Sequence, residues 1–272
     1  MAVNISGPIV LIGAGNMGGA MLTGWLKSGV PGSSVIVVDP GPSEAMLALI
    51  ADAGAKHVTA APEGMQAGVL FLAVKPQLMD AVLPPLKALV GPQTVVVSVA
   101  AGKTLAYLAS HLGAAAMVRA MPNTPAMIGR GVTGAFANAD VSEAQHAEVQ
   151  ALLQVSGPVE WVGSEADIDA VTAVSGSGPA YVFYLVECMA EAGRKAGLPA
   201  DLAMRLARET VSGAGELLNQ SPEDASRLRQ NVTSPGGTTA AALSVLMAED
   251  GMQPLFDRAI AAARDRAEEL AN

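Results

Sequence analysis

Five short apolar runs, each of strand length, recur along the first half of the chain. They are residues 8–13 (PIVLIG), 35–39 (VIVVD), 69–74 (VLFLAV), 95–99 (VVVSV) and 116–121 (AMVRAM). None alternates with polar residues, which is typical of strands buried on both faces of a parallel sheet. Helical stretches separate them, at residues 17–28, 43–53, 76–90 and 104–112. This alternation predicts a doubly wound α/β domain of Rossmann type, with two more strands near residues 132–136 and 159–162.

The pattern changes after Gly163, where β-branched runs stop and helical stretches take over. Proline at helix starts and glycine after helix ends mark the boundaries, and the expected helices are residues 179–197, 199–220, 238–249 and 253–270. Residues 221–224 (SPED) are typical of an N-cap followed by an acidic first turn. We therefore expect two domains: residues 1–165, a dinucleotide-binding Rossmann domain, and residues 166–272, an all-helical domain.

The first apolar run leads directly into a glycine-rich loop, GAGNMG at residues 13–18. Gly13 permits a tight turn, Gly15 lets the backbone approach a pyrophosphate, and Gly18 lets the next helix pack close to the sheet. A strand before the loop, a helix after it and an acid at the end of the next strand predict a dinucleotide site. The expected contacts are Gly13, Gly15, Asn16, Met17 and Gly18. The alternative is a glycine-rich turn without a ligand.

Asp39 ends the second run, about 20 residues after Gly18, as expected for an acid that binds the adenosine ribose. Its carboxylate would repel a 2′-phosphate and no arginine follows closely, which favours NADH over NADPH; the alternative is a turn cap before Pro40. Ligands of open α/β sheets bind at the carboxyl ends of the strands. Further expected cofactor contacts are Ala73, Val74, Lys75, Pro76, Ala100, Ala101 and Asn123. Lys75 is equally consistent with a solvated surface lysine.

The segment VTSPGGTT, residues 232–239, is the most distinctive part of the second half. Gly236 and Gly237 leave backbone amides open to close approach. Thr238 and Thr239 lie at an expected helix N-terminus, where amides and the helix dipole favour an anion. The segment has the chemistry to hold a substrate carboxylate, and the alternative is an ordinary turn with a threonine N-cap.

A strong proton acceptor is missing from the expected helical domain, residues 166–272, which contains no histidine. Lys195, and Tyr107 in the first half, lie outside any motif. Dehydrogenases that act on alcohols need such a group beside the carbinol. A cyclic iminium is already protonated and accepts hydride directly, so orientation and one hydroxyl near the ring nitrogen suffice. The residues therefore favour an imine substrate.

Composition excludes several classes of protein. The net charge of −9 argues against a nucleic-acid partner, which needs a basic surface. Cys188 is the only cysteine, so no disulfide framework is expected, and we expect a packed core thiol. The three histidines are far apart, so no metal is expected. The apolar runs are too short to span a membrane and no basic leader precedes them, so we expect a cytoplasmic protein.

Five segments together resemble the pyrroline-5-carboxylate reductases, the last enzymes of proline biosynthesis. They are GAGNMG (13–18), AVKP (73–76), RAMPNTP (119–125), VSGSGPAYVF (174–183) and VTSPGGTTAAAL (232–243). The resemblance covers nearly the whole chain, and the last two segments are specific to the family. It implies reduction of 1-pyrroline-5-carboxylate to L-proline by hydride transfer from NADPH or NADH.

The resemblance also implies roles for single residues. Thr239 is the catalytic hydroxyl that donates to the substrate ring nitrogen. The implied substrate-binding residues are Ser234, Gly236, Gly237, Thr238, Asn231 and Ser175. The helical domain would dimerise through interlocking helices, and the homodimers would assemble further, up to a decamer. Members of the family differ in cofactor preference, and the basic residue that some carry after the second strand is absent here, so the choice between NADH and NADPH stays open.

Two other classes compete with this interpretation. The β-hydroxyacid dehydrogenases share the two-domain plan but carry a catalytic lysine on the long helix, four residues after a G-x-G, where this chain has Val182. A nucleotide-binding regulatory protein would keep residues 13–18 but would not need residues 234–239. Oxidation of NADH with and without pyrroline-5-carboxylate distinguishes an enzyme from a regulatory protein.

Overall fold

The computed structural model describes residues 5–271, which form two compact units. The first unit combines Met1–Gly176 with Ala263–Asn272, and the second is Ser177–Ala262. The last helix of the chain therefore contributes to both units. The division into domains at residue 165 stays a prediction.

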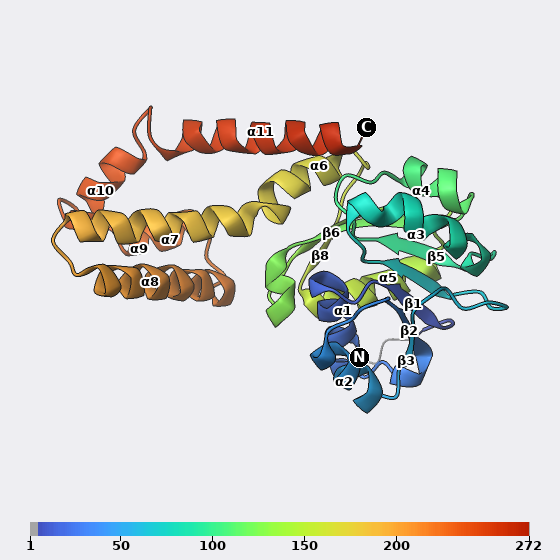
Figure 1. Ribbon diagram of the computed structural model, residues 1–272. Helices are drawn as coiled ribbons and strands as arrows, with labels where there is room; N and C mark the ends of the chain where they lie inside the picture. The colour runs from blue at the N-terminus through green and yellow to red at the C-terminus, as the bar shows by residue number, and fades with distance from the viewer. Residues whose placement is uncertain (1–4, 272) are drawn as a thin grey trace. The chain divides into compact units, whose positions relative to one another are not determined.

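The first unit is built on one eight-stranded sheet (Figure 1), with the order β3-β2-β1-β4-β5-β6-β7-β8. The strands are β1 (Ile9–Ile12), β2 (Val35–Val38), β3 (Lys56–Val58), β4 (Val69–Leu72), β5 (Val95–Ser98), β6 (Ala116–Pro122), β7 (Thr133–Ala137) and β8 (Val159–Trp161). All pairs are parallel except β6 with β7. The predicted Rossmann-type α/β fold is confirmed.

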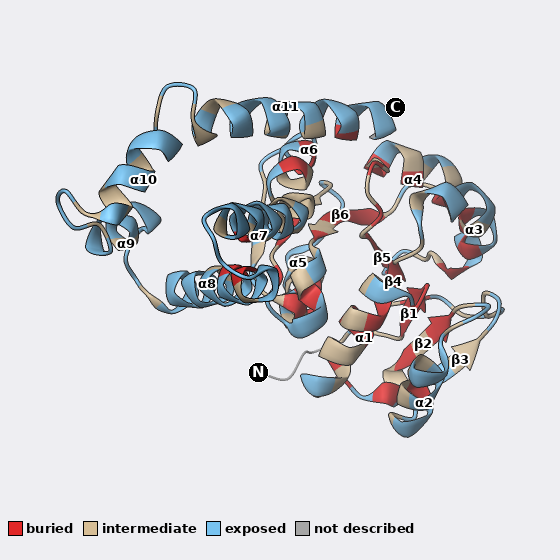
Figure 2. Ribbon diagram, turned by 60° about the vertical axis from the view of Figure 1, so that its left-hand side comes forward, coloured by how far each residue is buried: buried red, intermediate tan, exposed pale blue. Residues whose placement is uncertain are grey.

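Helices cover both faces of the sheet, which is why central strands such as β1 and β4 are continuously apolar (Figure 2). In β1, Ile9 and Leu11 belong to one core with Trp25, whereas Val10 and Ile12 belong to the other with Leu83. The helices of this unit are α1 (Asn16–Lys27), α2 (Glu44–Asp52), α3 (Met79–Leu86), α4 (Leu105–Leu112), α5 (Glu143–Leu153) and α6 (Asp167–Val171). Burial on both faces leaves the strand ends and their loops to carry polar chemistry.

The predicted helix at residues 76–90 is divided into three pieces. These are the 3-10 turn η2 (Pro76–Leu78), α3, and the 3-10 turn η3 (Lys87–Leu89). Pro84 and Pro85 lie inside α3 and have no amide to donate, so the α-helical bonding stops soon after them. A π-helical turn, η6 (Thr172–Gly176), continues α6 and was not anticipated.

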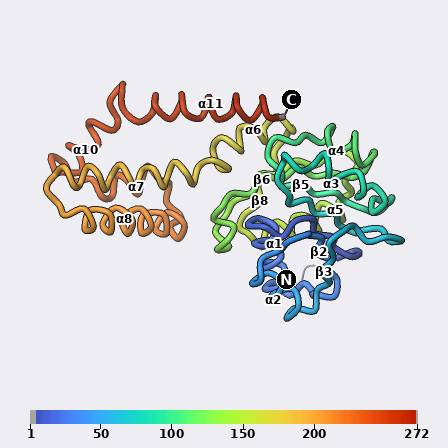
Figure 3. The backbone as a smooth tube through the Cα atoms, viewed as in Figure 1, coloured from blue at the N-terminus to red at the C-terminus, as the bar shows by residue number. Residues whose placement is uncertain are grey.

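The second unit is all helical, as predicted, and its backbone is traced in Figure 3. It contains α7 (Gly178–Lys195), α8 (Ala200–Gln220), α9 (Ala225–Asn231), α10 (Thr238–Leu246) and the first part of α11 (Met252–Ala271). The expected acidic first turn after residue 221 is wrong, because α9 begins after Asp224 and carries no acid in its first turn. Within the described residues, no helix is long and apolar enough to cross a membrane.

Large apolar side chains of the second unit remain exposed (Figure 2). Phe183, Tyr184 and Val245 are 62%, 65% and 70% exposed. The buried residues of α7 and α8 are only the alanines Ala190, Ala203 and Ala207. Cys188 is also exposed, so the expected core thiol is wrong for the single chain. Large apolar side chains of this unit are therefore left uncovered in the single chain.

Candidate active site

The glycine loop joins β1 to α1 and divides its glycines between two tasks. Gly13 has a φ of +87°, and a Cβ there would lie 2.9 Å from the carbonyl oxygen of Ala73. A Cβ on Gly18 would collide with the carbonyl oxygen of Gly13. Gly15, by contrast, has no atom within 4 Å of its Cβ position. Gly13 and Gly18 therefore serve the fold, and Gly15 faces open space at the start of α1.

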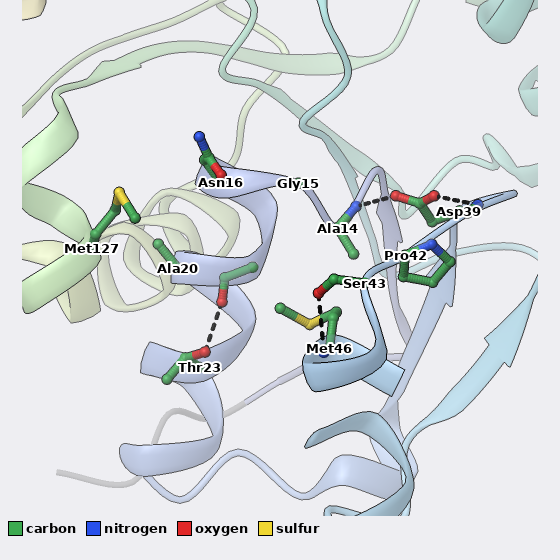
Figure 4. A pocket seen from close by; sticks show the side chains of 12 residues that line it. Ala14, Gly15, Asn16, Ala20, Thr23, Asp39, Pro42, Ser43, Met46 and Met127 are labelled. Carbon is green, nitrogen blue, oxygen red and sulfur yellow. Dashed lines mark hydrogen bonds between the residues drawn. The ribbon is translucent and has the colours of Figure 1, made fainter. Parts of the chain in front are cut away.

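A pocket of about 380 Å³ opens beside this loop (Figure 4). Its lining residues are Ala14, Gly15, Asn16, Gly19, Ala20, Thr23, Asp39, Gly41, Pro42, Ser43, Met46 and Met127. Three predicted cofactor residues, Gly15, Asn16 and Asp39, thus border one cavity. The lining from α1, α2 and Met127 was not foreseen, because only the fold brings these residues together.

Asp39 is fixed at the edge of the pocket by two backbone amides. Its Oδ2 accepts a hydrogen bond from the Ala14 amide at 2.7 Å, and its Oδ1 accepts one from Gly41 at 2.8 Å (Figure 4). The hydrogen bond from Gly41 is the one expected if Asp39 caps the turn at Pro40. The hydrogen bond from Ala14 connects Asp39 to the glycine loop as well. Within the described lining, Asp39 is the one charged side chain, and no lysine or arginine borders the pocket.

The other predicted strand-end residues follow β4, β5 and β6. The Ala73 amide donates to the carbonyl of Ile12 at 2.8 Å, which places the segment Ala73, Val74, Lys75 and Pro76 beside the glycine loop. Lys75 itself is exposed. Ala100 and Ala101 lie after β5 and, like residues 73–76, are outside the pocket lining. Met17 lies in the first turn of α1.

Asn123, after β6, contacts the predicted substrate residue Ser175. Its Nδ2 donates to the Ser175 Oγ at 3.4 Å, and its Oδ1 accepts from the Val132 amide at 3.0 Å. Ser175 lies in η6, and π-helical turns are frequent at functional sites. The structure thus brings one predicted cofactor residue and one predicted substrate residue together at a strand end.

The remaining predicted substrate residues lie at the end of α9, in the loop that follows it and at the start of α10, all in the second unit. Gly237 is the N-cap of α10 and provides no side-chain hydrogen bond, so the alternative of a threonine N-cap is wrong. Among the described residues, neither Thr238 nor Thr239 has a hydrogen-bond partner for its hydroxyl. Both hydroxyls and the first amides of a nine-residue helix are therefore available to an anion.

The rest of this loop is ordered by its own contacts. Asn231, the last residue of α9, donates from Nδ2 to the Glu223 Oε2 at 2.9 Å. Gly236 has a φ of +69°, which allows the chain to turn sharply before α10. Ser234 is exposed. Asn231, Ser234 and residues 236–239 therefore all belong to the one segment that runs from the end of α9 to the start of α10 in the second unit.

The two side chains considered as proton acceptors are occupied elsewhere. The Tyr107 hydroxyl donates to the Asp80 Oδ1 at 2.7 Å, and burial together with this bond raises the pKa of Tyr107 to about 12. The Lys195 Nζ lies 3.6 Å from Glu191. Within residues 5–271, no group of three or more His, Cys, Asp or Glu side chains could hold a metal. Neither Tyr107 nor Lys195 borders the pocket beside the glycine loop.

Comparison with known proteins covers the whole chain. The family described as "NADP oxidoreductase coenzyme F420-dependent" matches residues 8–102, and "Pyrroline-5-carboxylate reductase dimerisation" matches residues 165–270. The pyrroline-5-carboxylate reductase of Pseudomonas aeruginosa is 42% identical over 97% of this chain and 96% of its own length. That of Haemophilus influenzae is 38% identical over 96% of this chain and 97% of its own length.

Two solved structures agree. A pyrroline-5-carboxylate reductase from Coxiella burnetii superposes with a TM-score of 0.90 at 35% identity and covers 98% of this chain and 99% of its own. The pyrroline carboxylate reductase of Plasmodium falciparum, solved with NADP bound, has a TM-score of 0.82 at 25% identity and covers 100% of both chains. Both arrangements of site residues, the glycine loop and the α10 N-terminus, lie in the matched regions. The chain belongs to the pyrroline-5-carboxylate reductase family.

Proposed function

We propose that this protein reduces 1-pyrroline-5-carboxylate to L-proline with NADH or NADPH as the hydride donor. The observation that carries the proposal is the N-terminus of α10, where Gly237 caps the helix and leaves the Thr238 and Thr239 hydroxyls without partners among the described residues. An enzyme that reduces a protonated cyclic imine bearing a carboxylate needs such donors and no base. The dinucleotide pocket beside Gly15 supports the same activity.

The residues of the second unit bind and orient the substrate in this proposal. The first amides of α10, with Ser234 and residues 236–238, hold the carboxylate against the positive end of the helix dipole. Asn231 in the second unit and Ser175 in the first unit are each proposed as substrate-binding residues. As the ring carbon gains hydride, a lone pair forms on the ring nitrogen, and Thr239 donates a hydrogen bond to it. A bound dihydronicotinamide supplies the hydride, and no side chain needs to remove a proton.

The cofactor-binding residues hold the dinucleotide at the strand ends. Gly15, Asn16 and the α1 N-terminus face the pyrophosphate, where a Cβ on Gly15 would fill the open space. Asp39 faces the adenosine ribose. The remaining predicted contacts, which are Gly13, Met17, Gly18, Ala73, Val74, Lys75, Pro76, Ala100, Ala101 and Asn123, shape the loop and the nicotinamide half of the site.

An absorbance assay tests the proposed function. Oxidation of NADH and of NADPH is followed with and without 1-pyrroline-5-carboxylate, and proline is identified as the product. We expect oxidation only when the substrate is present. Failure of the substrate to stimulate oxidation of either cofactor would contradict the proposal and favour a regulatory nucleotide-binding protein.

Asp39→Ser is expected to raise the efficiency with NADPH relative to NADH about tenfold. The change removes a carboxylate that would repel the 2′-phosphate, and a partly screened repulsion at short range is worth roughly 1–2 kcal/mol. The ratio of kcat/KM for the two cofactors measures it. Asp52→Ser, which removes an exposed carboxylate at the end of α2, is the matched control. An unchanged ratio in Asp39→Ser would leave Asp39 as a turn residue only.

We propose a homodimer formed through the second unit, with further assembly up to a decamer. The match to a dimerisation family and the exposed apolar side chains of α7 support this. Light scattering at micromolar concentration should give at least twice the chain mass of 27.4 kDa. Phe183→Asp should lower that mass, because it buries a charge in the contact, whereas Arg205→Asp, at an exposed ion pair on α8, should not. A monomeric wild type would contradict the assembly.

The proposed setting of the reaction is the cytoplasm, where NADH and NADPH are available as reductants. The substrate is a small molecule, and the net charge of −9 does not favour a nucleic-acid partner. No membrane partner is proposed.

A further inference from the structure

Arg119 is a buried cation within the sheet of the first unit. It lies in β6 and is 2% exposed. Its Nη2 donates to the Asp169 Oδ1 at 2.7 Å, and its Nη1 lies 3.6 Å from the Glu165 Oε1. Asp169 is itself only 7% exposed. Removing such a charge from water costs several kcal/mol unless partners compensate it, so the guanidinium and both carboxylates form one interdependent group.

The group joins three separate segments of the chain. Arg119 belongs to β6, and Asp169 belongs to α6. Glu165 precedes α6, and its Oε1 also accepts a hydrogen bond from the Leu105 amide at 2.7 Å. Leu105 is the first residue of α4 and follows the loop after β5. One buried arginine thus fixes a strand, the helix that leads into η6, and the start of α4.

Each of these segments continues into predicted site residues. The strand β6 leads to Asn123, and α6 leads through η6 to Ser175, where the two side chains meet at 3.4 Å. The fit between them is close, because a Cβ on Gly176 would lie 2.6 Å from the Met121 Cε. A small displacement of α6 would therefore move Ser175 relative to the strand end.

We propose that Arg119, with Asp169 and Glu165, is a positioning group for the reductase reaction. It acts through Asn123 and Ser175 and touches neither substrate nor cofactor. Well-packed apolar residues often replace buried ion pairs without loss of stability, so stability alone does not explain three charged groups here. The planar guanidinium of Arg119 presents two N–H groups at fixed angles, so it can orient both carboxylates at once. Because these carboxylates lie in α6 and just before it, the arginine fixes the position of α6 and of η6, which follows it. The inference rests on the proposed function.

Asp169→Asn and Arg119→Lys test the inference in the full-length protein. We expect kcat per cofactor-binding site to fall about tenfold, since small misplacements of reacting groups are costly. The dissociation constant for NADH should change by less than about threefold, because the glycine loop is untouched. With 4-deuterated NADH, the isotope effect on kcat should increase as hydride transfer becomes slower.

Glu148→Gln is the matched control, because Glu148 is another buried carboxylate, 6% exposed, in α5. It accepts hydrogen bonds from the Ser6 amide at 2.9 Å and the Ser6 hydroxyl at 2.7 Å, just before β1. It should lose stability yet keep the wild-type kcat and isotope effect. Glu165→Gln is the test variant if the other two do not fold. Glu165 is half-buried, and the glutamine amide oxygen can still accept the hydrogen bond from the Leu105 amide.

Three results would overturn the inference. The first is a wild-type kcat, KM and isotope effect in all three site variants. The second is an equal loss in Glu148→Gln, which would reduce the role to stability. The third is a wild-type protein without substrate-dependent oxidation of NADH or NADPH, which removes the proposed function together with this inference. If the wild-type protein is an active reductase and the variants of Arg119, Asp169 and Glu165 are equally active, the positioning role alone is wrong and the proposed function stands.

Discussion

Replacing Gly15 with valine is expected to abolish binding of both NADH and NADPH while the protein stays folded. Apart from residues adjoining it in the chain, no atom lies within 4 Å of the Cβ position, and the negative φ of −70° is one that L residues adopt. The added side chain would instead occupy the space of the pyrophosphate. We expect at least roughly a hundredfold loss of affinity by calorimetry, with a nearly unchanged Tm without cofactor.

Gly18→Ala provides the contrast within the same loop. Its added Cβ would meet the Gly13 carbonyl oxygen, so the backbone must shift, and we expect a lower Tm even without cofactor. The pair of variants separates a glycine needed for the ligand from one needed for the fold. Normal cofactor affinity in Gly15→Val would exclude this loop from the site.

Thr239→Ala is expected to lower kcat roughly tenfold to a hundredfold, with a milder loss in Thr239→Ser. A lost donor at an oxyanion site costs on the order of a hundredfold or more, and a forming amine is less demanding. Cofactor affinity should hardly change, because Thr239 lies in the second unit and the glycine loop in the first. Steady-state kinetics with 1-pyrroline-5-carboxylate and calorimetry with NADH measure the two effects.

The structure makes this test cleaner, because α10 is capped by Gly237 and does not depend on the Thr239 hydroxyl. Thr233→Ala is the matched control: the Thr233 Oγ1 donates to the Arg229 carbonyl at 2.6 Å. Its loss should cost about 1 kcal/mol of stability and leave kcat close to that of the wild type. A Thr239→Ala enzyme with wild-type turnover would show that water or another residue serves the ring nitrogen.

Most strands of the sheet were predictable from their apolar residues, and one polar strand at the sheet edge was not. All five apolar runs and both further candidates are strands. β1, β4 and β5 are buried along their whole length, as expected for strands covered on two faces. β3 was missed, since Lys56 and His57 make it polar at the sheet edge. α5 was missed too, although its Ser142–Gln145 capping box is a recognisable start signal. The antiparallel pairing of β6 with β7 depends on tertiary packing.

The candidate site divides along similar lines. The glycine loop and the α10 N-terminus were predictable, because backbone shape and helix ends dictate the residues there. Arg119 was overlooked within an apolar run, and its partner Asp169 is 50 residues away, a separation that no local pattern encodes. Met127 borders the pocket for the same reason, since only folding places it opposite α1. The roles of all these residues stay predictions.

The return of α11 to the first unit has a consequence for how the protein is made. Residues from Ala263 onward belong with the Rossmann unit, where Ala267 is buried. A Cβ on Gly102 would lie 2.9 Å from the Leu270 Cβ, so this helix end sits against the loop after β5. During translation, the first unit therefore cannot complete its packing until residue 270 has left the ribosome, although most of this unit is synthesised first. An affinity tag or fusion joined behind this helix would be attached next to that loop.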